Sequence, residues 1–106
     1  METKIYRIEE SDELGDYELE DIEKLNARWL VYYYEEGDYE GSGFAVWESD
    51  GKLYYHDMGH CSCYGPTEEM KNVMPIENIS EIEKFADNYN SGDKVVEFIK
   101  DNKLHS

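Results

Sequence analysis

"RWLVYYYEEGDYEGSGFAVWESDGKLYYHDMG", residues 28–59, contains the clearest strand pattern of the chain. Three of its segments, 28–35, 42–48 and 52–58, are rich in the aromatic and β-branched residues that favour strands. The sequences "EGDYEG" and "SDGK" separate these segments and carry glycine and aspartate at positions typical of hairpin turns. Residues 28–58 are therefore predicted to form a three-stranded antiparallel β-meander.

The first of these strands carries large side chains on both sides. Successive side chains of a strand point to opposite faces of the sheet. Two sets result: Trp29, Val31 and Tyr33 on one face, and Leu30, Tyr32 and Tyr34 on the other. Neither set is plainly polar, so this strand is expected either to be central in the sheet or to expose a face of tyrosines.

Before the meander, the sequence predicts one short helix. "KIYRI" near the N-terminus is compatible with a short strand. Further on, Leu19, Ile22 and Leu25 recur at helical spacing, which predicts an amphipathic helix over residues 17–26 with Asp16 as its N-cap.

After Pro66 the pattern becomes helical. Ser80 and Glu83 have the spacing of a capping box and predict a helix that ends at Gly92. The sequence "DKVVEFIKDNK" predicts a second helix with its apolar residues facing inward. Residues 1–106 are thus expected to form a single small acidic α+β domain: a three-stranded meander, an N-terminal acidic helix and two C-terminal helices packed on the sheet.

Charge is the most unusual property of the composition. The chain has 26 acidic residues against 10 Lys and Arg, which gives a formal net charge of −16. Such a charge disfavours direct binding to nucleic acid or to an anionic membrane, so a partner should be basic. The alternative is an acidic surface that only keeps the chain in solution, or an acidic part that is partly disordered. No apolar run approaches the length of a membrane span, and a cytoplasmic location is expected.

The acids are concentrated in the first half of the chain. Residues 1–53 carry 16 acids and 5 bases, whereas residues 54–106 carry 10 and 5, and no Lys or Arg occurs between Ile8 and Glu23. The expected partner-binding residues are those of the acidic run and of the first hairpin: Glu9, Glu10, Asp12, Glu13, Asp16, Glu18, Glu20, Asp21, Glu23, Glu35, Glu36, Asp38, Tyr39 and Glu40.

"HDMGHCSCYGP", residues 56–66, is the other notable sequence. Zinc accepts all four of His56, His60, Cys61 and Cys63 as ligands, but adjacent His60 and Cys61 cannot easily reach one ion. A catalytic thiol is disfavoured because the negative charge of the chain raises the pKa of a cysteine. We therefore expect a structural turn, with no cofactor, no catalytic residue and no enzymatic activity, and keep the metal site as an alternative.

Three parts of the sequence together resemble a known pattern. They are "YEGSGF" at 39–44, "DGKLY" at 50–54 and "GHCSCYG" at 59–65. This combination resembles a family of small, largely uncharacterised proteins of tailed bacteriophages and prophages, although Gly43 stands where that family has alanine. The resemblance covers roughly residues 22–66 and implies a phage origin, but no reaction.

A phage origin gives the acidic residues a specific meaning. DNA-binding proteins carry grooves of Lys and Arg that match the spacing of phosphates. We expect a non-enzymatic inhibitor that presents a DNA-mimicking acidic surface to a host restriction, CRISPR-type or repair nuclease. Tyr17, Tyr33 and Tyr39 are its expected aromatic anchors. The alternative is a small-ligand or metal-binding module that uses the loop at 56–65.

Overall fold

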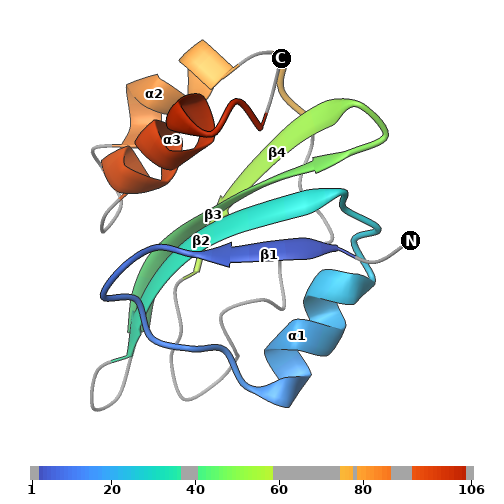
Figure 1. Ribbon diagram of the computed structural model, residues 1–106, viewed down its shortest axis with the longest axis vertical. Helices are drawn as coiled ribbons and strands as arrows, with labels where there is room; N and C mark the ends of the chain where they lie inside the picture. The colour runs from blue at the N-terminus through green and yellow to red at the C-terminus, as the bar shows by residue number, and fades with distance from the viewer. Residues whose placement is uncertain (1–2, 37–40, 59–74, 78, 87–91, 105–106) are drawn as a thin grey trace.

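The computed structural model describes residues 3–36, 41–58, 75–77, 79–86 and 92–104 (Figure 1). It confirms the predicted α+β class. The elements in chain order are β1 (Lys4–Arg7), α1 (Asp16–Glu23), β2 (Trp29–Glu36), β3 (Gly41–Ser49), β4 (Lys52–Asp57), α2 (Ile79–Ala86) and α3 (Gly92–Asp101).

The strands form one mixed sheet in the order β1-β2-β3-β4. The antiparallel meander β2-β3-β4 is confirmed. The prediction of a three-stranded, wholly antiparallel sheet was wrong in detail, because β1 adds a fourth strand that is parallel to β2. In this pairing Lys4 lies opposite Trp29 and Arg7 opposite Tyr32. The intervening α1 supplies the long connection that two parallel strands require.

Helices cover both faces of this sheet (Figure 1). On one face α2 and α3 pack on Trp29, Val31 and Tyr33, in what we call the helix-pair cluster. On the other face Ile22 of α1 packs with the alternate residues of β2, in what we call the α1 cluster. The predicted alternation along β2 is confirmed, and its tyrosines are buried, so β2 is a central strand with no exposed tyrosine face.

Four predicted helix ends were wrong, the first because α1 ends at Glu23, with Lys24 as its C-cap, and not at residue 26. The residue before α1 is Gly15, which caps it without a side-chain hydrogen bond, and Asp16 is the first helical residue. Ser80 lies inside α2, and the carboxylate of Glu81 accepts the backbone N–H of Glu77 at 2.8 Å. Gly92 begins α3 instead of ending the preceding helix. A Cβ there would lie 2.3 Å from the Ala86 carbonyl oxygen, which explains why the residue is glycine.

The turn between β3 and β4 follows the sequence signal. Asp50 and Gly51 both have positive φ, 53° and 78°, as the two central residues of a type I′ turn require. Ser49 and Lys52 pair across it. Within the part of the chain that the structure describes, no helix is long and apolar enough to cross a membrane.

Candidate acidic binding surface

The first part of the acidic run is bonded to the central strand. Beyond β1, the N–H of Ile8 donates to the Tyr32 carbonyl at 3.0 Å, and the N–H of Asp12 donates to the Tyr34 carbonyl at 2.8 Å. Between these two bonds Glu9 and Glu10 are exposed, and Glu10 has a left-handed φ of 74°. The acids at 9–13 therefore lie on a backbone that continues the pairing of the sheet.

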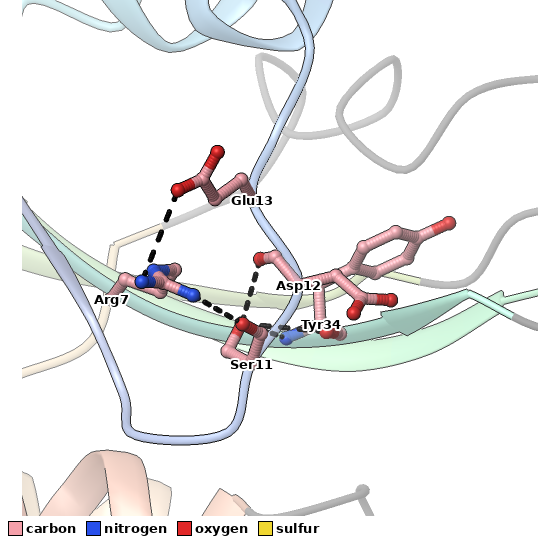
Figure 2. A network of polar contacts seen from close by, with 5 residues as sticks. All are labelled: Arg7, Ser11, Asp12, Glu13 and Tyr34. Atoms are coloured by element: carbon pink, nitrogen blue, oxygen red, sulfur yellow. Dashed lines mark hydrogen bonds and ion pairs between the residues drawn. The ribbon is translucent and has the colours of Figure 1, made fainter.

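Ser11 connects this segment to β2 through its side chain (Figure 2). Only 3% of Ser11 is exposed, and its Oγ accepts the N–H of Tyr34 at 2.9 Å and donates to the Asp12 carbonyl at 3.0 Å. Arg7 adds a second connection, since its Nη1 donates to the Ser11 carbonyl at 2.7 Å. Its Nη2 lies 4.0 Å from Oε1 of Glu13. A buried hydroxyl and one guanidinium thus fix the position of the acidic segment.

Helix α1 carries the second part of the run. Ile22 is fully buried in the α1 cluster, and Leu14 and Leu25 pack beside it, which turns the polar face of the helix outward. Tyr17 is 83% exposed among these acids. The acids of α1 are exposed at Asp16, Glu20 and Glu23 and half-buried at Glu18 and Asp21.

A groove lies where the acidic segment meets α3. It has a volume of about 590 Å³ and is lined by Arg7, Ile8, Glu9 and Glu10 on one side and by Lys94, Glu97, Phe98 and Asp101 on the other. The acids of α3 were not among the predicted binding residues. Their i, i+4 spacing places them on one face of the helix, but only the packing of α3 on the sheet brings that face beside Glu9 and Glu10.

A smaller hollow of about 310 Å³ lies between α2 and α3. Glu97 and Asp101 line this hollow as well, so they separate it from the groove. Across this hollow, Lys100 of α3 forms an ion pair with Glu83 of α2. The two cavities therefore share Glu97 and Asp101 and differ in the residues of their other walls.

The predicted hairpin residues are only partly described. Glu35 is exposed and accepts the hydroxyl of Tyr33 at 3.1 Å. Tyr33 itself is 7% exposed, so its assignment as a contact anchor was wrong. Glu36 pairs with Gly41 at the end of β2, but the side chain of Glu36 is not among the described side chains. Asp38, Tyr39 and Glu40 lie outside the described residues.

Of the alternative metal ligands, only His56 falls within the described ranges. It lies half-buried on β4, and its Nδ1 is 3.2 Å from Oδ1 of the adjacent Asp57. Among the residues that the structure places, no group of three or more His, Cys, Asp or Glu is arranged to hold a metal ion. His60, Cys61 and Cys63 lie outside the described residues, so the loop at 56–65 stays a prediction.

The phenol of Tyr32 is buried beneath the acidic segment. Burial raises its pKa above the ordinary value of 10.0, and the nearby charges of Glu13 and Asp12 act in the same direction. A hydrogen bond with the Leu14 backbone and the charge of Arg7 oppose this increase. The net increase means that the folded chain holds this proton more tightly than the unfolded chain does.

Stability should therefore fall at alkaline pH. A raised pKa in the folded state gives a contribution that is complete below the unfolded pKa and is lost as pH rises above it. We expect the free energy of unfolding, measured by urea denaturation between about pH 9 and about pH 11, to decrease less steeply in Tyr32→Phe than in the native chain. The exposed Tyr17→Phe is the control and should keep the native slope. Equal slopes for all three proteins would contradict this account.

Comparisons with protein-family models, with curated proteins and with solved structures found no match to the chain.

Proposed function

We propose that this chain is a non-enzymatic inhibitor of phage origin that binds a basic, nucleic-acid-binding host protein through a DNA-mimicking acidic surface. Its binding surface comprises the acidic segment at 9–13 and helix α1. The partner is a restriction, CRISPR-type or repair nuclease, whose Lys and Arg groove accepts carboxylates in place of phosphates.

One observation carries this proposal: the acidic segment is held in place before any partner binds. Hydrogen bonds from Ile8 and Asp12 and the buried hydroxyl of Ser11 attach the segment to β2. Binding of a flexible acidic tail would lose the entropy of ordering it, whereas a preorganised surface avoids that loss. The arrangement favours a recognition surface over acids that only aid solubility.

The backbone of Glu10 supports the same interpretation. Left-handed φ values are unfavourable for residues with a Cβ by about 1 kcal/mol, and glycine or asparagine usually occupies such positions. A glutamate there keeps a carboxylate at an exposed position at some cost in stability. Strain of this kind is typical of functional segments.

Tyr17 supplies an aromatic contact within the acidic surface. Charges at the rim of an interface mainly raise the association rate, while aromatic residues contribute much of the affinity. Of the expected anchors, Tyr17 is exposed among the acids of α1. Within the described ranges no observation favours the alternative of a ligand or metal module at 56–65.

The experiment that tests the proposal is capture of host proteins on the immobilised chain, followed by binding measurements with each purified candidate. A nuclease that binds directly, is released by rising salt and is displaced by duplex DNA would support DNA mimicry. A partner that DNA does not displace, or the absence of any basic partner, would overturn it.

The acids of α1 give a sharper prediction. The double variant Glu20→Gln with Glu23→Gln should lower the association rate with the captured partner by about tenfold and reduce its salt dependence. The matched control is Glu77→Gln with Asp50→Asn, which removes the same number of exposed acids elsewhere and keeps a residue suited to positive φ at position 50. Equal losses in both variants would indicate a general effect of net charge and would contradict a specific surface.

A further inference from the structure

The groove between the acidic segment and α3 contains more carboxylates than internal cations. Glu9, Glu10, Glu97 and Asp101 line it, and within the described part of the chain none of them forms an ion pair. Arg7 also lines the groove, but its guanidinium is turned toward Ser11 and Glu13 (Figure 2). Lys94 is then the remaining cation for four carboxylates.

The groove also has an aromatic wall. Phe98 is half-buried there, and its ring centroid lies 5.4 Å from that of Tyr6, with the rings tilted by 49°. Ile8 adds an apolar surface and is 7% exposed. An aromatic ring beside carboxylates suits a guanidinium group, which stacks on the ring and donates hydrogen bonds at its edge.

Two acids of α3 are placed unfavourably, and Lys94 and Lys100 on the same helix offset only part of the effect. Glu97 and Asp101 are like charges at i and i+4, a spacing that destabilises a helix. Asp101 is also the last residue of the helix, where the helix dipole disfavours a negative charge. A positive group bound in the groove would offset both effects.

The form of the groove indicates an organic cation and not a metal ion. Its carboxylates come from two separate walls, and no set of three or more metal-ligating side chains converges within the described residues. A volume of about 590 Å³ accommodates a whole side chain. The hollow between α2 and α3 is a poorer candidate, because it is smaller, at about 310 Å³, and none of its described lining residues is aromatic.

We propose that this groove receives an arginine side chain of the basic partner. Glu97 and Asp101 accept its guanidinium N–H groups from one wall, Glu9 and Glu10 from the other, and Phe98 stacks against it. The inference rests on the proposed function, because the arginine belongs to the partner that the acidic surface attracts. It adds an interaction on α3, on the sheet face opposite to α1.

The test uses N-acetyl-L-arginine amide as the probe, titrated into the full-length chain while the backbone amide spectrum is recorded by NMR. Shifts should cluster at residues 7–10 and 94–101. The matched probe N-acetyl-L-citrulline amide has the same shape without the charge and should produce none. Shifts spread evenly over all acidic residues, or equal effects of the two probes, would overturn the assignment.

Two double variants of equal charge decide whether the groove is the site. Glu97→Gln with Asp101→Asn should weaken probe binding by about tenfold, whereas Glu20→Gln with Glu23→Gln on α1 should leave it unchanged. Equal weakening in both variants would also overturn the inference. If the groove variant has no effect while the α1 variant still slows partner association, the arginine site fails and the proposed function stands. If the α1 substitutions do not slow association with the partner, the proposed function itself fails.

Discussion

Gly43→Ala should lower the free energy of unfolding by about 3 kcal/mol, equivalent to about 15 °C in melting temperature for a chain of this size. A Cβ at position 43 would lie 2.1 Å from the Tyr33 carbonyl oxygen and 2.8 Å from Cα of Tyr34. Both are backbone atoms of the central strand, so no side-chain rotation can relieve the overlap. The strands β2 and β3 would have to separate where Tyr34 faces Gly43.

Thermal unfolding followed by circular dichroism measures this loss, and Gly15→Ala is the matched control. Gly15 has ordinary extended dihedral angles, and a Cβ there meets only the flexible carboxylate of Glu18, at 3.0 Å. The control should cost no more than about 1 kcal/mol, the difference between glycine and alanine at a helix N-cap. A similar melting temperature for both variants would show that β2 and β3 tolerate the extra carbon.

Ser11→Ala is expected to destabilise the chain by about 2 kcal/mol and to loosen the acidic segment. The substitution removes the oxygen that accepts the Tyr34 N–H, in a position where only 3% of the serine is exposed and water cannot easily replace it. It also removes the donor to the Asp12 carbonyl. Amide exchange at residues 9–13 should therefore become faster, while exchange in β3 changes with global stability alone.

Ser49→Ala is the control for this prediction. The hydroxyl of Ser49 also bonds to backbone carbonyls, those of Leu25 and Asn26, but at 3.3 and 3.2 Å and in a half-exposed position. Its loss should cost less than about 1 kcal/mol and leave exchange at 9–13 unchanged. Equal losses of stability, or unchanged exchange in Ser11→Ala, would show that Ser11 does not fix the acidic segment.

The sequence predicts the parts of this fold that depend on local signals. The meander follows from alternation in β2 and from the Asp50–Gly51 turn, both of which act over a few residues. The strand β1 was not included in the sheet because it has four residues and pairs with β2 across α1. Parallel pairing leaves no turn signal in the sequence, so its existence depends on tertiary packing.

The candidate site was predicted to a similar degree. The acids of the N-terminal run and the exposed Tyr17 follow from charge and helical spacing. The role of Ser11 could not be predicted, because the sequence around a single serine in an acidic run does not indicate whether its side chain is buried or exposed. Glu97 and Asp101 were missed because their approach to Glu9 depends on how α3 packs on the sheet.

The two covered faces of β2 affect how the strands align. When one face of a sheet is in water, shifting the pairing of a strand by one residue moves its apolar side chains into water. The register of such a strand is therefore strongly specified. On β2 such a slip would only exchange the helix-pair cluster with the α1 cluster, because both faces are apolar. The correct register must then be specified elsewhere: by Gly43 where two backbones meet, by the turn at Asp50 and Gly51, and by Ser11 opposite Tyr34. The register of the large apolar residues thus depends on one glycine within the sheet and on residues just outside its strands.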